Sequence, residues 1–280
     1  MKSLYLSIVL ALALFVSSLQ AFQYEVTICA IYNDDDLPYM KEWIQFHKKQ
    51  GVQHIYLYNN GKPNNSTNFK RYIKKKYVEV TEWNFPGKNV NEWNKIQCDA
   101  YMDCINKIKT KTRWCAFIDT DEFLFSPSAK KLKKALKNYK DCSAVGVNWV
   151  MYGTSGVQRI LPKQKMTNLL VYRSELSCEV NKHVKSIVNP RRVQECDNPH
   201  FFIYAQGFAV NENRERIQGA FTEKNSVNHL RLNHYWLRDE DFLRNIKIPR
   251  RLAWGDRSNI VDTNKTLLNK QFDNIMKRFN

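Results

Sequence analysis

Apolar segments of strand length alternate with helix-like segments along the first half of the chain. Four segments are short, mostly apolar and rich in β-branched or aromatic side chains, as buried strands are: residues 26–32, 54–58, 114–118 and 145–151. Residues 77–83 are expected to form a further strand. Helical spacing of apolar residues lies between them, over 38–51 and 92–109 and again from Ser126-Pro127 onward. This order predicts an α/β sandwich in which helices flank a mainly parallel central sheet. No repeat or low-complexity linker follows residue 22, so we expect one domain over residues 22–280.

Polar and acidic residues follow two of these strands directly. Tyr32 and Asn33 end the first strand and precede Asp34-Asp35-Asp36, and residues 114–118 run into Asp119-Thr120-Asp121-Glu122. Ligands of such sheets bind beyond the carboxyl ends of the strands. Both groups are therefore candidates for a ligand site, with Tyr32 and Asn33 as candidate contacts of the ligand.

Asp119 and Asp121 project to the same side of an extended segment, because side chains alternate along it. Two carboxylates so placed suit a hard divalent cation such as Mg²⁺ or Mn²⁺, which also takes water and substrate phosphates as ligands. The alternative is a loop of solvated acids. Apolar residues 114–118 and 123–125 on either side favour the first interpretation, since they pin the acids between buried segments.

The N-terminus points to the secretory pathway. Residues 1–21 have the order of a signal peptide, with Lys2 before an apolar run and Ala21 at the end, and an uncleaved signal-anchor is the alternative. Either form allows membrane association through residues 4–22. Glycosylation sequons at residues 64–67 and 264–266 agree with a secreted protein or one in the lumen of the endoplasmic reticulum or Golgi.

The seven cysteines show no zinc-site spacing and suit an oxidising compartment. Cys29 and Cys115 lie in apolar strands and are expected to be buried thiols. Cys178 and Cys196 flank a polar segment and are our candidate disulfide.

The chain is strongly basic, with 44 Lys and Arg against 27 Asp and Glu, a net charge of +17. That excess predicts an anionic partner. Nucleic acid is disfavoured because the lysines are scattered in amphipathic patterns and do not interleave with aromatic residues, as they do in binding grooves. A nuclease or nucleic-acid-binding function is therefore not expected.

Six ordered sequence blocks resemble glycosyltransferase family 92, the former DUF23 group, whose members have the GT-A fold of nucleotide-sugar transferases. The Asp119-Thr120-Asp121 tripeptide matches the Asp-x-Asp motif of that fold. The blocks are CAIYNDDDLPYMKEWIQFHKKQGVQHIYLYNN (29–60), QCDAYMDC (97–104), RWCAFIDTDEFLF (113–125), NWVMYGTSGV (148–157), HVKSIVNP (183–190) and NHYWLRDEDF (233–242).

The resemblance implies an inverting, Mn²⁺-dependent (or Mg²⁺-dependent) transfer of a hexose, with galactose favoured, from a UDP-sugar to a glycan acceptor. It implies that Asp121 binds the metal and that Asp119 contacts the metal or the donor ribose. A histidine late in the chain often completes the metal shell in this fold. His234 is our first choice and His200 the second, whereas His47, on an apolar helical face, is expected to be a core residue.

Other roles follow from the chemistry of the transfer. Lys185, Arg191 and Arg192 are candidates to contact the departing phosphate, whose charge must be neutralised. The acceptor hydroxyl needs a base, for which Glu179 is our candidate ahead of Glu175 and Asp197. Trp149 and Tyr152 are candidates to stack on a sugar.

One block departs from the family pattern. Many members have Lys-Ser after the His-Tyr-Trp residues, where this chain has Leu237-Arg238-Asp239. The departure leaves an alternative open, in which the chain is a non-catalytic carbohydrate-binding protein on a degenerate transferase scaffold.

Overall fold

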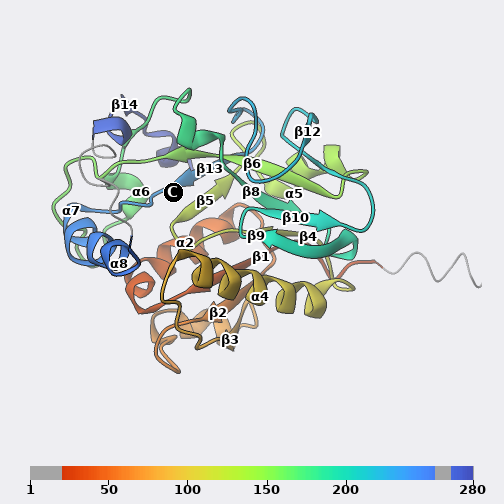
Figure 1. Ribbon diagram of the computed structural model, residues 1–280, viewed down its shortest axis with the longest axis horizontal. Coiled ribbons are helices and arrows are strands. Elements are labelled where there is room, and N and C mark those ends of the chain that lie inside the picture. The colour runs from red at the N-terminus through yellow and green to blue at the C-terminus, as the bar shows by residue number, and fades with distance from the viewer. Residues whose placement is uncertain (1–20, 256–265, 280) are drawn as a thin grey trace, which may run out of the picture.

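A computed structural model describes residues 21–255 and 266–279 of the chain, and a ten-stranded sheet runs through its middle (Figure 1). Eight strands follow the order β12-β11-β6-β8-β4-β1-β2-β3, and β13 pairs with β6 and β5. Their bounds are β1 Tyr24–Tyr32, β2 His54–Asn59, β3 Val78–Glu82, β4 Thr112–Phe117, β5 Glu122–Phe125, β6 Ala144–Met151, β8 Val184–Val188, β11 Ala209–Val210, β12 Arg216–Ile217 and β13 Arg231–His234.

The sheet is mainly parallel, as predicted. Strands β1, β2, β3 and β4 pair in parallel, and β6 is parallel to β11 and β13. Strand β8 is antiparallel to both of its neighbours, β4 and β6. The amino end of β8 therefore lies at the same edge of the sheet as the carboxyl ends of β4 and β6.

Helices cover both faces of the sheet, which confirms the predicted sandwich. Alternate residues of β1 point to opposite faces. Ile28 and Ala30 share a core with Trp43 of α2 (Leu37–Lys49), whereas Cys29 shares the other with Tyr101 of α4 (Val90–Ile108). Burial of each large apolar side chain contributes about 1.5–3 kcal/mol, which is why residues 28–32 of β1 carry apolar side chains on both faces.

The helix expected from Ser126-Pro127 is shorter than predicted. Ser126 Oγ accepts a hydrogen bond from the Ala129 backbone N–H, but α5 covers only Leu132–Leu136, and a 3₁₀ turn follows it. Leu132, Leu136 and Tyr139 are buried, so the apolar pattern was correct and only the start of the helix was wrong. The hydroxyl of Ser126 closes a local turn, which competes with helix formation.

The second half of the chain contributes shorter elements. A hairpin pairs β9 (Val193–Asn198) with β10 (Phe201–Tyr204) and packs on α4, and β7 (Tyr172–Arg173) pairs with β14 (Gln271–Phe272). The remaining helices are α3 Lys70–Lys74, α6 Met166–Leu169, α7 Glu240–Phe242 and α8 Ile248–Ala253. A π-helical turn, Leu243–Lys247, joins α7 to α8.

The predicted disulfide is wrong. Cys178 and Cys196 are both free thiols, and Cys196 on β9 contacts Cys98 on α4 instead. Cys29 and Cys115 are buried, as expected. The prediction relied on the polar segment between Cys178 and Cys196. It failed because β9 packs on α4, which places Cys196 beside Cys98.

The predictions for the N-terminus fall mostly outside the described residues, as does most of the sequon at 264–266. Within residues 21–255 and 266–279, no helix is both long and apolar enough to cross a membrane. Asn64 of the first sequon is exposed in the loop after β2.

Candidate active site

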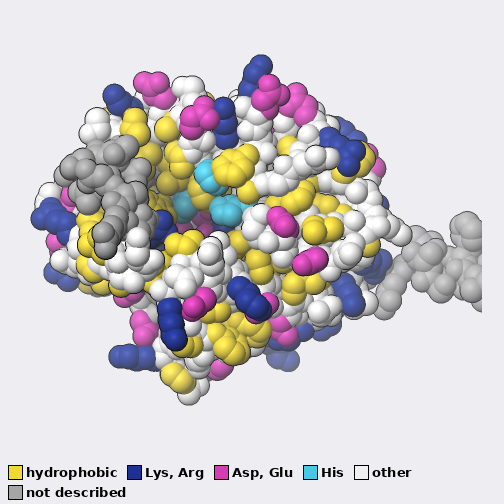
Figure 2. All heavy atoms as spheres, viewed as in Figure 1, with side chains coloured by type: hydrophobic (Ala, Val, Ile, Leu, Met, Phe, Trp, Pro, Cys, Tyr) yellow, Lys and Arg dark blue, Asp and Glu magenta, His cyan; other side chains and the backbone are white. Residues whose placement is uncertain are grey.

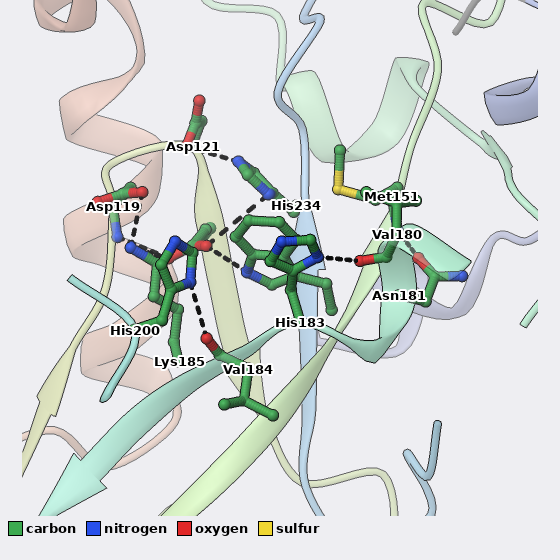
Figure 3. A network of polar contacts seen from close by, with 12 residues as sticks. Asp119, Asp121, Met151, Val180, Asn181, His183, Val184, Lys185, His200 and His234 are labelled. Atoms are coloured by element: carbon green, nitrogen blue, oxygen red, sulfur yellow. Dashed lines mark hydrogen bonds and ion pairs between the residues drawn. The ribbon is translucent and has the colours of Figure 1, made fainter. Parts of the chain in front are cut away.

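Functional side chains from four parts of the sequence meet at one edge of the sheet. Asp119 and Asp121 follow β4, Lys185 begins β8, and His234 ends β13. Figure 2 shows histidine side chains in a hollow of this face, bordered by hydrophobic side chains, and Figure 3 shows the polar network inside it. The predicted Asp-x-Asp residues and His234 are thus brought together.

Asp119 is held from two sides. Its Oδ2 lies 2.9 Å from Lys185 Nζ, and its Oδ1 accepts a 2.6 Å hydrogen bond from Gln97 Nε2 of α4. Lys185 is 1% exposed. Burial alone would raise the pKa of Asp119, but the Lys185 ammonium outweighs it and keeps the pKa below its usual value. Asp119 is therefore a fixed carboxylate, and Lys185 is its partner.

Glu122 connects the parts of the site. Its Oε2 accepts a 2.7 Å hydrogen bond from the Asp119 backbone N–H, and its Oε1 accepts one of 2.5 Å from the Trp149 indole. Lys185 Nζ lies 4.0 Å from Oε2, and His234 Nδ1 lies 3.8 Å from Oε1. Complete burial raises the pKa of Glu122 to about 7. Glu122 directly follows the motif, but its position in the sequence alone does not predict this role.

Asp121 faces His234. Their Oδ1 and Nε2 atoms are 3.3 Å apart, and the backbone N–H of Tyr235 donates to the Asp121 carbonyl at 2.9 Å. Burial would raise the pKa of Asp121, but His234, Lys247 and Arg238 together lower it. Asp121 is ionised at neutral pH as a consequence.

Two cations border Asp121 from the C-terminal segment. Lys247 lies in the π-helical turn with its ammonium 4.7 Å from the Trp236 ring centre, and burial lowers its pKa to about 8. Arg238 is 2% exposed, forms an ion pair with Asp36 and donates to the Asp35 carbonyl at 3.0 Å. The residue that departs from the family pattern is thus built into the fold, where it joins the end of β1 to the segment after β13.

The chemistry of Asp121 and His234 fits a divalent cation. Two ligands about 2.1 Å from an ion and at right angles to one another are about 3.0 Å apart, close to the 3.3 Å between these atoms. The second nitrogen of His234, Nδ1, is buried without a hydrogen-bond partner in the described residues and faces the Glu122 carboxylate, as second-shell carboxylates face ligand histidines. Within the described ranges, no group of three His, Cys, Asp or Glu is arranged as a complete site. Water and donor phosphates would supply the other ligands.

Three histidines surround Trp149. The His183 ring stacks on the indole at 4.8 Å, and the centroids of His200 and His234 lie 5.1 and 4.5 Å away. Nδ1 of His183 and of His200 each lie within 3.0 Å of a backbone carbonyl, which can only accept, so both nitrogens carry the proton. Burial lowers both pKa values, to about 3 for His200. Both imidazoles are neutral at pH 7.

Several predicted residues lie away from this network. Glu179 is exposed and pairs with Lys182 at 2.8 Å, although Val180 beside it accepts the His183 hydrogen bond. Glu175 and Asp197 are exposed too. Arg191 and Arg192 follow the carboxyl end of antiparallel β8, so they lie at the edge of the sheet opposite to Lys185.

Tyr32 and Asn33 keep their predicted place at the end of β1. The Tyr32 hydroxyl donates to Asn65 at 3.1 Å, and Asn33 caps the 3₁₀ turn of Asp34–Asp36. His47 is a core residue as expected: its Nδ1 lies 3.0 Å from the Trp43 carbonyl, and its Nε2 accepts from the Leu124 N–H at 3.1 Å.

Comparison with known proteins shows the family of the chain. The family model for glycosyltransferase family 92 matches residues 23–275. A family 92 protein of Oryza sativa subsp. japonica is 29% identical over 54% of this chain and 25% of its own length, and one of Ricinus communis is 25% identical over 72% of this chain and 37% of its own. The chain thus spans between a quarter and two fifths of the length of these relatives. A crystal structure of S. aureus TarS residues 1–349 aligns with a TM-score of 0.38 at 11% identity, over 59% of this chain and 47% of TarS.

Proposed function

Because the chain belongs to glycosyltransferase family 92, we propose that it transfers a hexose from a UDP-sugar to a glycan acceptor with the help of Mn²⁺ or Mg²⁺. Galactose is the favoured sugar, and inversion at the anomeric carbon is the expected outcome. The observation that supports the proposal best is the cluster at the carboxyl edge of the sheet in which Asp121, Glu122, Lys185 and His234 are buried and Asp119 is partly exposed. Burial of so many charges is costly unless they serve one another and a ligand.

In the proposed reaction Asp121 and His234 would hold the cation, and the Glu122 carboxylate faces the Nδ1 side of His234 at 3.8 Å. A bound divalent cation supplies neutralisation of the charge that develops on the departing UDP. Asp119, fixed by Lys185 and Gln97, orients the donor. Its rigid placement reduces the entropy that binding must overcome.

Lys247 adds a positive charge near Asp121. Its ammonium lies 4.7 Å from the Trp236 ring centre, and its charge helps to lower the pKa of Asp121. A phosphate leaving group is stabilised by such a cation. Tyr32 and Asn33, at the end of β1, stay candidates for nucleotide contact, and Glu179 stays the candidate base.

The N-terminal signal-like segment and the sequons support a location in the lumen of the secretory pathway, where UDP-sugars and glycan acceptors are both found. The proposed substrates and the proposed location thus agree.

Calorimetric titration with UDP, with and without Mn²⁺, tests the reaction class. Wild-type protein should release heat with UDP only when Mn²⁺ is present, and Asp121→Asn should release none. Asp99→Asn is the matched control, because Asp99 is an exposed acid of α4 that pairs with Lys95 on the same helix. UDP binding that is equal in Asp121→Asn and wild type would refute the proposal.

Turnover of a panel of UDP-hexoses then identifies the donor, with UDP-galactose expected to give the highest rate. A glycan affinity that is the same with and without UDP and Mn²⁺, together with no turnover of any UDP-hexose, would instead favour the carbohydrate-binding alternative.

A further inference from the structure

Phe221 presents an exposed aromatic ring beside the site. Its ring centroid lies 4.1 Å from that of His183, and the residue is 54% exposed. The backbone around it is fixed on both sides, since Thr222 N–H donates to the Lys182 carbonyl at 2.9 Å and Val184 N–H to the Ala220 carbonyl at 3.0 Å. The ring is thus held in place at the amino end of β8.

The aromatic residues that the sequence suggested for sugar stacking are not available. Tyr152 is fully buried, and its hydroxyl accepts a hydrogen bond from Arg231 at 2.9 Å. Trp149 is 8% exposed, its indole N–H is bound to Glu122, and His183 covers one face. The ring on the solvent side of this stack is that of Phe221.

His183 adds a hydrogen-bond acceptor next to this ring. Its Nδ1 proton is given to the Val180 carbonyl, so Nε2 is unprotonated, and in the described part of the chain Nε2 has no hydrogen-bond partner. An exposed apolar ring beside an acceptor nitrogen complements a sugar, which offers C–H groups on one face and hydroxyl donors at its edge.

The pair is continuous with the donor side of the site. Phe221 contacts His183, His183 stacks on Trp149, and Trp149 packs at 4.5 Å on His234, which faces Asp121. We propose that Phe221 and His183 form the subsite for the acceptor: the C–H face of the acceptor pyranose packs on Phe221, and one of its hydroxyls donates to His183 Nε2. This inference rests on the proposed function, and it adds where the acceptor binds.

Phe221→Ala tests the subsite with little risk to folding, because the side chain is largely exposed. The probes are a panel of methyl hexosides, with the UDP-sugar that gives turnover. The KM for the methyl hexoside should rise about tenfold in Phe221→Ala, which removes a stacking contact of about 1.4 kcal/mol. Phe221→Trp should restore the wild-type KM. The rate at which the UDP-sugar is hydrolysed by water should be equal in all variants, because water, unlike a pyranose acceptor, does not stack on the Phe221 ring.

Phe208→Ala is the matched control. Phe208 is 46% exposed, but it precedes β11 next to Ser143 at the other edge of the sheet, so its loss should leave the acceptor KM unchanged. A wild-type acceptor KM in Phe221→Ala would overturn the inference while leaving the transferase proposal intact.

A second measurement covers the case in which no UDP-sugar is turned over and the proposed function fails. Saturation-transfer NMR with the same methyl hexosides should then show magnetisation transfer from the protein to the pyranose C–H protons of the hexoside. We expect this transfer in wild type and in Phe208→Ala, and none in Phe221→Ala. Equal transfer in Phe221→Ala, or no transfer in wild type, would overturn the subsite itself.

Discussion

The ammonium of Lys185 lies 2.9 Å from the carboxylate of Asp119, a residue 66 positions earlier in the chain. The side chain of Lys185 is 1% exposed and that of Asp119 33%, so one partner is shielded from water and the other is not. Each partner keeps the other charged: the pKa of Lys185 is raised by Asp119 against the effect of burial, and that of Asp119 is lowered by Lys185. The fixed position of the Asp119 carboxylate thus depends on β8, a strand from the second half of the protein.

Lys185→Met should destabilise the protein, because it leaves Asp119 and Glu122 without their shared cation. Loss of one partner of a buried pair costs about 3 kcal/mol. Urea unfolding measures this cost. Lys95→Met is the control, since Lys95 and Asp99 form a pair that is 74% and 51% exposed and worth less than about 1 kcal/mol. Equal costs for the two variants would contradict the role of Lys185.

His234→Ala should weaken Mn²⁺ binding at least about tenfold, because it removes a ligand and the group that Glu122 orients. Titration of Mn²⁺ followed by water-proton relaxation gives the affinity without any need for turnover. His229→Ala is the control, because His229 is an exposed histidine a few residues before β13. An unchanged Mn²⁺ affinity in His234→Ala would exclude it as a ligand.

Arg238 and Asp36 should be strongly coupled. The Arg238 guanidinium is buried against Tyr39 and Phe242, with ring centres 4.4 and 4.3 Å away. A double-mutant cycle with Arg238→Ala and Asp36→Asn should give a coupling energy of about 1–3 kcal/mol in urea unfolding. The exposed pair Arg214 and Asp141 should give less than about 1 kcal/mol in the same measurement. Coupling no larger than that of the exposed pair would show that Arg238 acts by packing alone.

His47 should make the protein less stable in acid. Burial lowers its pKa from 6.5 to about 3, so below pH 6.5 the unfolded chain takes up a proton that the folded chain does not. The free energy of unfolding should therefore fall as pH drops from 6.5 toward 3, by up to about 1.4 kcal/mol per pH unit from this group.

His47→Gln removes this titration. The stability difference between wild type and His47→Gln should narrow as urea unfolding is repeated at pH 7, 6, 5 and 4. A difference that is constant with pH would mean that His47 takes up its proton at the same pH in the folded and unfolded states.

Sequence patterns predicted the local elements and the strand-end acids well. Strand β1 has apolar residues on both faces because helices cover both, and that requirement is visible in residues 26–32 alone. The prediction that His234 lies beside Asp121 came from the family resemblance and not from the spacing of residues. The position of α5 was less visible, because the Ser126 hydroxyl can begin a helix or close a turn with the same hydrogen bond.

Contacts between distant segments were not predictable from spacing. Gln97 of α4 donates a hydrogen bond to Asp119, which follows β4. Phe221 and His183 are joined by an isolated antiparallel β-bridge. The thiol of Cys196 contacts that of Cys98 because β9 packs on α4. The spacing of the cysteines along the chain does not indicate this packing. Such contacts depend on the order of strands in the sheet, and the sheet order is a property of the whole chain.

Strand β8 lies between β4 and β6, although it follows both in the sequence. On the ribosome the N-terminal strands β1 to β4 emerge first, and β4 then waits with an open edge until residue 188 has left the exit tunnel. Any pause or truncation before that point leaves two hydrophobic strand edges exposed at once, which is the situation that promotes aggregation. We therefore expect chaperone dependence during synthesis to rise with β4 and to fall when β8 is inserted, the step that also brings Lys185 to Asp119.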